Sequence, residues 1–448
     1  MTGLPFGRGY KEQVQRLRAE RPMGRSQGAP GLNAMVLGSG GREYAIAWAL
    51  ARADSVATID AIPGNGGTHL FARTIDLDPH DIAALERHVA AAHIDLAVVG
   101  PDELIAAGLG DALRRSAIAV VGAGRDAAKI EWSKAFAKEL MREAGVPTAE
   151  WTAYPDADAA RDALPDGGVV VKADGLAAGK GVVVARTRAE AEEALVSPHI
   201  HGGAVVLEEV LEGEEASLHA LVDGETVVAL PTAKDHKRVG DGDTGPNTGG
   251  MGAVSPHPHL PDAEAQGLAD LLIAPVARAL AARGTPYRGV VFAGLIDAPG
   301  GWRVLEYNAR FGDPEAQVLL PRIEGDVGRL FLALGEGRLA QHVADSPLRF
   351  SPRTYVDVAL CAEGYPGAVK GGDLIEGLDA PPEGVYFFHA GTKRAGTRAV
   401  TAGGRVVHAV GQGETLAQAR ERAYAAAEQV RWPGRFYRSD IGVAEVES

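Results

Sequence analysis

The chain has little cysteine, few aromatic residues and no long apolar run, and each scarcity excludes a class of protein. Cys361 is the only cysteine among 448 residues, which rules out an intrachain disulfide and fits a reducing compartment. It lies in the apolar run VDVALCAEG, so we expect a core residue rather than a nucleophile. No stretch looks able to span a bilayer, and no long basic run offers itself to nucleic acid. We therefore expect a cytoplasmic protein whose partners include neither membrane nor nucleic acid.

The remaining composition is that of an ordinary globular protein. Hydrophobic residues make up 46% and charged residues 23% of the chain, and the net charge is −14. Residues 1–33 differ, because they are basic and carry Gly and Pro at both ends. They contain no apolar signal region. We predict a partly disordered extension with a short solvated helix, and a transit peptide stays an alternative.

Between residues 34 and 132, strand-like and helix-like segments alternate, which predicts a parallel α/β domain. Its first unit, NAMVLGSGGREYAIAWALAR, reads as strand, glycine loop and helix. Gly40 and Gly41 stand where a strand would meet a helix N-terminus, which is a place suited to an anion. Glu43 occupies the position of the third glycine in a dinucleotide-binding G-x-G-x-x-G motif, so NAD binding is disfavoured.

A glycine-rich hairpin is predicted further along, with residues 169–172 and 182–185 as strands around DGLAAGKG. It is not a P-loop, because the glycine-to-lysine spacing is one residue short and a strand follows instead of a helix. Its glycines would aim backbone N–H groups at phosphate oxygens, and Lys172 and Lys180 would add positive charge. A plain hairpin that needs glycine at positive φ is the alternative.

An acidic turn follows the hairpin. Glu208 and Glu209 end an apolar strand, and Glu215 stands after the turn at Gly213. Backbone groups after such a strand can contact an adenine edge, and a nearby carboxylate can accept from ribose hydroxyls. Without its context, this stretch is a hairpin with an acidic turn.

Residues 233–262 form a run dense in Gly, Asp and Thr, which we interpret as a long loop. At about 30 residues it exceeds ordinary connections, and such loops are usually lids or disordered. Lys234, His236, Lys237 and Arg238 cluster at its start, and basic side chains on a lid suit closure over a polyanion. For His236, a surface position and a ligand contact are equally open.

The stretch LEYNARFGDPEAQ places Glu306, Asn308 and Arg310 at alternate positions, so an extended strand would put them on one face. Carboxylate and amide oxygens suit Mg²⁺, and a guanidinium suits a carboxylate or phosphate. Asp297, on the preceding predicted strand, would be an outer partner of the metal. A surface strand with alternating polar residues is the alternative.

After residue 332 the pattern becomes α+β, with short strands and one strong helix. The scattered cations here are expected to be solvated surface charges: Lys370, Lys393, Arg405 and Arg438.

In combination these motifs resemble the ATP-grasp superfamily and, within it, the phosphoribosylamine–glycine ligase family. The resemblance rests on KADGLAAGKGV, EEVLEGEEAS, DHKRVGDGDTGPNTGGMGA, EYNARFGDPEAQ, GYPG and FHAGTK, which stand in family order between residues 34 and 443. It implies an ATP-grasp fold of four parts, α/β combined with α+β. These are an N-terminal α/β domain for the amine at 34–132, a small lid subdomain at 133–207, a central catalytic subdomain at 208–335 and a C-terminal domain at 336–448.

The resemblance also implies the reaction. Glycine and 5-phosphoribosylamine would be joined through an acyl phosphate, with ATP and Mg²⁺ or Mn²⁺ as cofactors, by a monomer or weak dimer. No protein nucleophile is needed. Two alternatives stay open: a specialised enzyme with another amine, hydrazine or amino acid, and an ATP-binding pseudoenzyme.

Site residues follow from the matching motifs. The phosphate-binding set is Lys134, Lys172, Gly175, Gly179, Lys180 and Gly181. Adenine and ribose would be held by Glu208, Glu209, Val210 and Glu215, and the metal by Glu306 and Asn308. The reacting groups would meet Asp235, Lys237, Arg238 and Arg310. The amine would be bound by Gly40, Gly41, Arg42, Glu43, Tyr44 and Asp102.

Departures from the family pattern lie in the N-terminal half. Tyr44 replaces a usual His, Asp102 a Glu, Leu104 a Pro and Trp132 a Gly, and residues 121–123 read VGA instead of FGP. The ATP and metal motifs are intact. This contrast predicts retained ATP chemistry and leaves the identity of the acceptor amine open.

Overall fold

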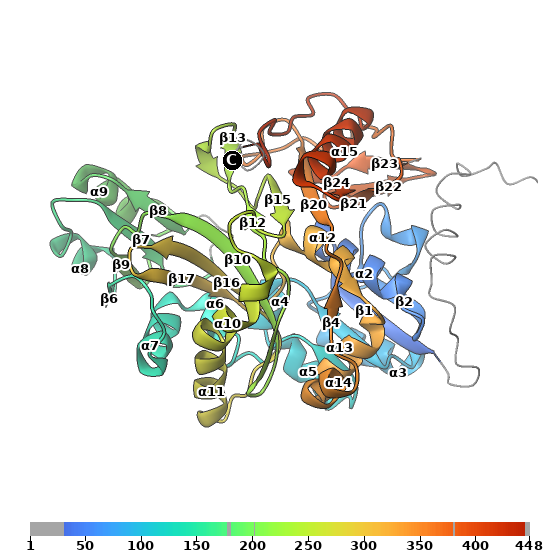
Figure 1. The fold of residues 1–448 in the computed structure, drawn as a ribbon, viewed down its shortest axis with the longest axis horizontal. Helices are drawn as coiled ribbons and strands as arrows, with labels where there is room; N and C mark the ends of the chain where they lie inside the picture. Colours follow the sequence, from blue (N-terminus) through green and yellow to red (C-terminus); the bar gives the residue numbers. More distant parts are fainter. Residues whose placement is uncertain (1–30, 177–180, 201, 380, 444–448) are drawn as a thin grey trace, which may run out of the picture.

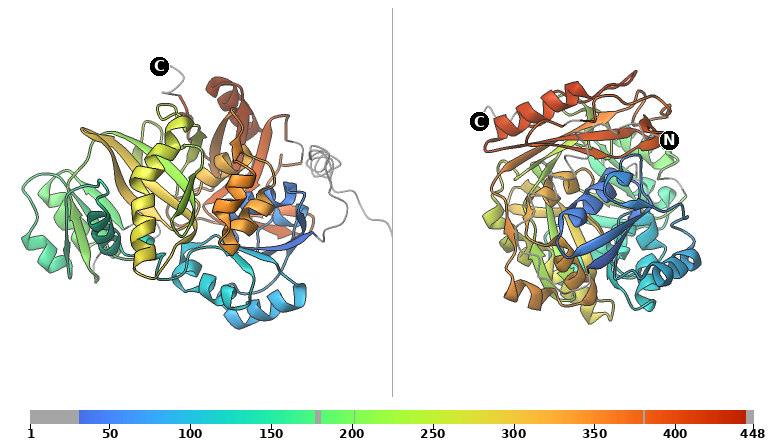
Figure 2. Two further views of the ribbon diagram at one scale, coloured as in Figure 1. Left: turned by 60° about the horizontal axis from the view of Figure 1, so that its bottom comes forward. Right: turned by 90° about the vertical axis from the view of Figure 1, so that its right-hand side faces the viewer.

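A computed structural model describes residues 31–176, 181–200, 202–379 and 381–443, arranged in four regions (Figure 1). Most of the basic extension at 1–33 thus lies outside the described residues, as do Gly179 and Lys180. The small region with α8 (Ala157–Asp162) and α9 (Arg188–Val196) projects from one end of the molecule, and the C-terminal helix α15 (Leu416–Gln429) covers one face of its sheet (Figure 2).

The N-terminal region is a parallel sheet of strand order β3-β2-β1-β4-β5, which confirms the predicted α/β domain. Its strands are β1 (Leu32–Gly38), β2 (Val56–Pro63), β3 (Arg73–Thr74), β4 (Leu96–Val99) and β5 (Ala119–Val121). Its helices are α2 (Gly41–Arg52), α3 (Ile82–Ala92), α4 (Asp102–Ala106) and α5 (Leu109–Arg115). The strand order reverses between β1 and β4, and ligands of open α/β sheets bind at the carboxyl ends of strands at such a point.

The small region is an antiparallel sheet of order β6-β9-β7-β8. Its strands are β6 (Trp151–Tyr154), β7 (Val169–Ala173), β8 (Val182–Ala185) and β9 (Val205–Glu208), and its helices are α8 (Ala157–Asp162) and α9 (Arg188–Val196). The pairing of β7 with β8 confirms the predicted hairpin.

Residues 129–144, KIEWSKAFAKELMREA, form two helices, α6 (Lys129–Trp132) and α7 (Lys134–Ala144). The division falls at Ser133, whose hydroxyl accepts a hydrogen bond from the Phe136 N–H at 3.2 Å and so caps α7. Gly145 ends α7 in the left-handed conformation, at φ +68°, as the Gly-then-Pro pattern predicts.

The central region is an antiparallel sheet of order β11-β10-β16-β17. Its strands are β10 (Glu214–Asp223), β11 (Thr226–Ala229), β16 (Arg288–Ala298) and β17 (Gly301–Asn308). Helices α10 (Asp262–Leu272) and α11 (Ala274–Ala282) pack on it. The stretch Asp262–Ala282 meets length and hydropathy criteria for a membrane span, which sequence inspection overlooked. Its apolar residues Leu272, Val276 and Leu280 belong to the protein core, as in a core helix.

The C-terminal sheet has the order β12-β15-β20-β24-β21. It contains β20 (Thr354–Cys361), β21 (Val385–His389) and β24 (Arg405–Gly413), with α15 (Leu416–Gln429) packed on β24 and β20. Two strands come from the expected long loop: β12 (Lys234–Asp235) and β15 (Gly252–Ser255). The prediction of one unstructured lid was therefore wrong, because strand pairing between regions remote in sequence orders this segment.

The rest of that segment forms the hairpin of β13 (Arg238–Gly240) and β14 (Thr244–Asn247). Arg438 anchors the hairpin, since its guanidinium contacts Asp243 at 2.7 Å and the Arg238 carbonyl at 3.1 Å. Arg438 is only 3% exposed, and Arg405 is also largely buried, so the expectation of solvated charges was wrong for both. Lys370 and Lys393 are exposed, as predicted.

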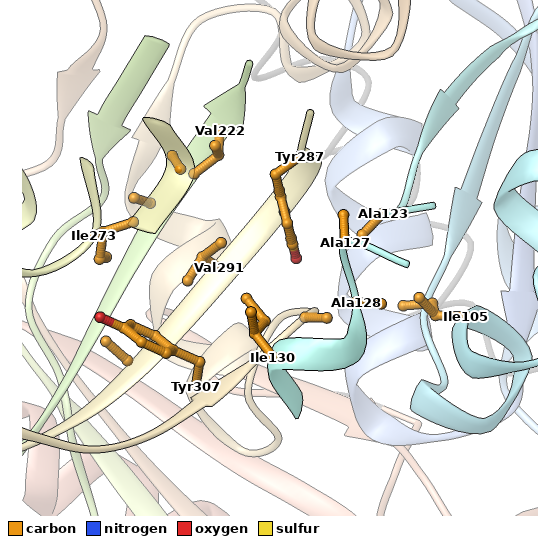
Figure 3. Close-up of a cluster of buried hydrophobic side chains, with 14 of the residues drawn as sticks. Ile105, Ala123, Ala127, Ala128, Ile130, Val222, Ile273, Tyr287, Val291 and Tyr307 are labelled. Atoms are coloured by element: carbon orange, nitrogen blue, oxygen red, sulfur yellow. The ribbon is translucent and has the colours of Figure 1, made fainter. Parts of the chain in front are cut away.

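One hydrophobic core joins the N-terminal region to the central sheet (Figure 3). Ile105 and Ala127 approach from the N-terminal side, and Val291 and Tyr307 from the central strands. Tyr287 lies between the two sides and donates its hydroxyl to the Val290 carbonyl at 2.6 Å. The core thus fixes the carboxyl ends of β1 and β4 relative to β17. Cys361 is fully buried and burial raises its pKa to about 12, which confirms a core role.

Candidate active site

The end of strand β17 carries the predicted metal face. Glu306 pairs with Gly294 of β16, and Asn308 pairs with Phe292. Arg310 lies just beyond the strand, and its guanidinium donates to the Asn308 side-chain oxygen at 3.2 Å. The alternation read from the sequence therefore places these side chains together.

Glu306 stands among cations. Burial would raise the pKa of its carboxyl, but Lys134, Lys172, Lys237 and Arg310 outweigh that effect and lower it. The carboxylate is therefore ionised at neutral pH, with four cations near it. Such a centre suits a polyanion bound together with a divalent cation.

The residues at this centre fit Mg²⁺ or Mn²⁺. Glu306 offers an ionised carboxylate, and Asn308 offers an amide oxygen that accepts from the Arg310 guanidinium at 3.2 Å. No group of three or more His, Cys, Asp or Glu side chains suited to a metal occurs within the described ranges. Mg²⁺ commonly takes one or two protein ligands and completes its shell with phosphates and water. Asp297 is exposed beside the turn between β16 and β17, so the structure does not bring it to this group.

Lys172 reaches the same centre from the small region. Its ammonium donates to the Leu305 carbonyl of β17 at 2.9 Å and pairs with Glu208, also at 2.9 Å. Glu208 in turn pairs with Lys138 at 2.8 Å, and all three side chains are buried. The Glu208 carboxylate is thus engaged by two lysines, and in the sheet Glu208 pairs with Val170 of β7 and Trp151 of β6.

Lys138 was missed in the sequence. Burial lowers the pKa of its ammonium to about 8, although Glu208 opposes the shift. Its second hydrogen bond goes to the Thr148 hydroxyl at 2.6 Å. A signal existed, because Lys134 and Lys138 share one helix face at i and i+4.

The remaining predicted nucleotide residues are distributed as follows. The Glu209 carboxylate accepts from the Glu150 N–H at 3.0 Å and from Arg303 at 3.1 Å, and Val210 is the second residue beyond the end of β9. Glu215 forms an ion pair with Lys237. A Cβ at Gly175 would meet no atom within 4 Å, which leaves room beside the hairpin. Gly181 directly precedes β8.

The four residues of the segment DHKR differ in burial and in the groups that they contact. The Asp235 Oδ1 is buried without a hydrogen-bond partner, and burial together with Glu315 raises the pKa of its carboxyl. The Lys237 ammonium lies among Glu215, Glu306 and Asp235, which raises its pKa despite burial. Arg238 is exposed and donates to the Gly245 carbonyl of its own hairpin at 2.7 Å, so the structure does not bring its guanidinium to Glu306. His236 is buried, which decides against a surface position.

The predicted amine site lies at the carboxyl ends of β1 and β4. The Gly40 N–H donates to the Glu43 carboxylate at 2.7 Å, and Glu43 pairs with Arg42. Arg42 also donates to the Phe311 carbonyl at 3.3 Å, which links α2 to the segment after β17. A Cβ at Gly41 would stand 2.6 Å from the Gln317 side chain, so glycine permits this close approach.

Arg310 joins the two halves of the site. Its guanidinium lies 2.9 Å from the Glu131 carboxylate and 3.9 Å from that of Asp102. Burial would raise the pKa of Asp102, but Arg310 and Arg42 lower it. Glu131, which was not singled out in the sequence, also accepts the Ala309 N–H at 2.7 Å. Its position within EWSK, beside the matched Lys134, was the available signal.

The structure does not bring Tyr44 to this group. Its ring is 2% exposed and packs against Phe71 at 5.0 Å, His389 at 5.4 Å and Phe388 at 6.0 Å between centroids. Tyr44 was predicted at the amine site because it follows Glu43, yet its side chain packs against Phe388 and His389 of the C-terminal sheet. Trp132, the other bulky departure, lies under the Lys129 ammonium, 5.5 Å from its ring centroid.

His219 is a further residue that the sequence did not reveal. Its ring stacks on Phe292 at 4.5 Å, and its Nε2 accepts the Gly312 N–H at 3.0 Å. Burial, aided by Arg310, lowers its pKa to about 3, so the imidazole is neutral. It supports the turn that follows Arg310.

These features define the class of protein. Two antiparallel sheets, one with a glycine hairpin and a lysine, the other with a carboxylate–amide pair, make an ATP-grasp fold attached to a parallel α/β domain. A biotin carboxylase domain of the 2-oxoglutarate carboxylase from Hydrogenobacter thermophilus shares this fold, with a TM-score of 0.68 and 18% identity over 90% of this chain and 91% of that one.

The family follows from closer matches. Models of the phosphoribosylglycinamide synthetase N domain, ATP-grasp (A) domain and C domain match residues 32–131, 132–316 and 355–444. The chain belongs to the phosphoribosylamine–glycine ligase family, which are ATP-grasp carbon–nitrogen ligases.

Individual relatives agree along nearly the whole length. The phosphoribosylamine–glycine ligase of Vibrio vulnificus strain YJ016 is 43% identical, covering 92% of this chain and 98% of that protein. The enzyme of that name from Rhodopirellula baltica is 41% identical, covering 91% and 97%. A crystal structure of the Thermotoga maritima phosphoribosylamine–glycine ligase has a TM-score of 0.77 and 33% identity, covering 92% of this chain and all of that one.

Proposed function

We propose that the protein joins glycine to 5-phosphoribosylamine, with ATP, to give glycinamide ribonucleotide, ADP and phosphate. The observation that carries the proposal is the single carboxylate of Glu306 among four cations, linked through Arg310 to the carboxyl ends of β1 and β4. The family and the full-length relatives that bear the ligase name support it. They also favour glycine as the amino acid and phosphoribosylamine as the amine over the other amino acids and amines that the sequence left open.

The first step joins two anions. A glycine carboxylate oxygen attacks the γ-phosphorus of ATP, and the bond to the β–γ bridging oxygen breaks, which gives an acyl phosphate and ADP. Carboxylate and triphosphate repel each other, so cations have to bring them together. Lys134, Lys172 and Lys237 supply that charge around Glu306. A Mg²⁺ or Mn²⁺ ion held by Glu306 and Asn308 would neutralise further phosphate charge when bound.

The second step forms the amide. The amine nitrogen attacks the acyl carbon, the bond from that carbon to the phosphate oxygen breaks, phosphate leaves, and one N–H proton is released. Asp102, with Arg42 and Glu43 at the helix α2 N-terminus, would orient the phosphorylated amine. Arg310 would steady the acyl phosphate, although Glu131 and Asp102 already balance much of its charge.

The substrates assigned to the chain are small, charged and water-soluble, which supports a cytoplasmic location. We propose a monomer or weak dimer, as the family resemblance implies.

A coupled ADP-release assay tests the function. The protein should release ADP only when glycine, phosphoribosylamine, ATP and Mg²⁺ are all present, and chelation of the metal should stop turnover. The glycinamide ribonucleotide formed is identified by mass spectrometry. Turnover with another amine but none with phosphoribosylamine would reject the substrate assignment while keeping the ligase chemistry.

A further inference from the structure

Arg405, at the first position of β24, reaches out of the C-terminal region into two segments of the active site. Its guanidinium pairs with the Asp313 carboxylate at 3.0 Å and donates to the Asp313 carbonyl at 2.7 Å. It also donates to the carbonyls of Gly249 and Gly250, the latter at 3.2 Å. One side chain therefore spans the glycine segment before β15 and the segment after β17.

The glycine segment supports the backbone of Lys237. Thr248 donates its N–H to the Lys237 carbonyl at 2.8 Å, and Met251 donates its N–H to the His236 carbonyl at the same distance. Gly250 leaves no room for adjustment, since a Cβ there would stand 2.7 Å from the Asp235 carboxylate and 2.3 Å from Pro314. A shift of the Gly249 and Gly250 carbonyls would therefore move Asp235 at the end of β12 and Lys237 in the link that follows it.

The second segment carries Arg310 and Glu315 on either side of Asp313. Burial would raise the pKa of Asp313, but Arg405, His408 and Arg42 lower this pKa to about 2. Asp313 also accepts from the Gln317 side chain at 2.7 Å, which fastens it to α12 (Glu315–Leu319). The Arg405–Asp313 ion pair is largely buried on both sides and is therefore weakly screened.

We propose that Arg405 is a positioning residue of the ligase reaction, which holds Lys237 and Arg310 in their relative places. A guanidinium suits this task because its fixed fork of donors contacts a carboxylate and several carbonyls at once. A lysine would keep the charge but would lose the simultaneous contacts. Arg405 touches none of Lys134, Lys172 and Glu208, so nucleotide binding by the small region does not depend on it.

The proposal rests on the proposed function for its kinetic test. Arg405→Gln should lower kcat by about 100-fold, the effect of misplacing reacting groups by about 1 Å. The dissociation constant for Mg·ADP, measured by titration calorimetry, should stay within about twofold of the wild type. The kcat of Arg405→Lys should lie between those of the wild type and Arg405→Gln, about 10-fold below the wild type.

Arg435 offers a matched control. It is also a C-terminal arginine that donates to two backbone carbonyls, those of Ala427 and Val430, but both acceptors lie within its own region. Arg435→Gln should change neither kcat nor the affinity for Mg·ADP in the folded protein. An equal loss of kcat in both glutamine variants, or wild-type kcat in Arg405→Lys, would overturn the positioning role.

A second measurement does not depend on the substrates. The Gly249 N–H donates to the Tyr365 hydroxyl at 2.9 Å and the Gly250 N–H to the Thr248 hydroxyl at 2.9 Å, so both amides should be protected from hydrogen exchange. Arg405→Gln and Arg405→Lys should raise exchange of a peptide covering 248–252, and Arg435→Gln should not. Unchanged exchange in Arg405→Gln would overturn the proposal. A wild type inactive with phosphoribosylamine, but with this exchange pattern, would reject the proposed substrate and leave the positioning role standing.

Discussion

Glu306 and Arg310 lie close together at the end of β17 and stand in opposite surroundings. Glu306 is a carboxylate whose charged neighbours are Lys134, Lys172, Lys237 and Arg310. Arg310 is a cation whose charged neighbours are Glu131, Asp102, Glu315 and Asp313. The first surroundings are cationic and suit a metal-bound triphosphate. The second carry an excess of negative charge and suit substrates that bring amino groups.

This difference divides the site into a nucleotide side and an amine side that share one short segment. On the nucleotide side four cations surround the Glu306 carboxylate, and a metal-bound triphosphate would lie among them. On the amine side the charges of Arg310 are already balanced within the protein. Substitutions on the nucleotide side should therefore change the kinetic constants for ATP, and substitutions on the amine side those for phosphoribosylamine.

The largest effect is expected from removing the carboxylate on the nucleotide side. Glu306→Ala should lower Mg²⁺-dependent ADP release by about 1,000-fold, because the metal and the cations lose their common anionic partner. Asp297→Ala is the matched control, since Asp297 is exposed on the neighbouring strand β16 and should have no effect. Full Mg²⁺-dependent amide formation by Glu306→Ala would show that the metal assignment is wrong.

A smaller effect is expected from removing one of the cations. Lys172→Met should lower kcat/KM for ATP by about 100-fold, as for loss of one charged donor to a transferred phosphoryl group. Lys138→Met removes the other lysine paired with Glu208, and it should lower stability without a comparable loss of kcat/KM for ATP. Equal kinetic losses in the two variants would mean that Glu208, rather than the phosphates, is the important partner of Lys172.

A change on the amine side should separate the substrates. Asp102→Asn should raise KM for phosphoribosylamine by about 10-fold, because a charged contact worth about 1.5 kcal/mol is lost, and should leave KM for ATP unchanged. Tyr44→Leu serves as the control, since its ring packs away from Asp102 and its loss should lower the melting temperature only. A higher KM for ATP in Asp102→Asn would contradict the division into two sides.

The smallest effect concerns stability and pH. The pKa of Lys138 is about 8 in the folded protein, below the ordinary lysine value of 10.5, so between these values the unfolded chain binds more protons. Stability that depends on Lys138 should therefore rise with pH across this window. Relative to Lys138→Met, the wild type should gain up to about 3 kcal/mol in free energy of unfolding. Urea unfolding at several pH values tests this, and parallel curves for the two proteins would contradict it.

The sequence alone determined the local elements and much of the nucleotide side. The β7–β8 hairpin, the end of β17 and the parallel N-terminal domain follow from periodicity and glycine positions, which act over a few residues. Glu306 and Asn308 share a face because a strand has a strict two-residue repeat, whereas Arg310 lies beyond the end of β17 and contacts Asn308 from there.

Only the tertiary structure decided which remote side chains meet. Glu208 is engaged by two lysines, Tyr44 packs into an interface, and β12 and β15 join the C-terminal sheet. Arg405, which looked like a solvated charge, spans two active-site segments. The physical reason is that burial and ion pairing depend on the packing of elements far apart along the chain, and no local pattern records that packing.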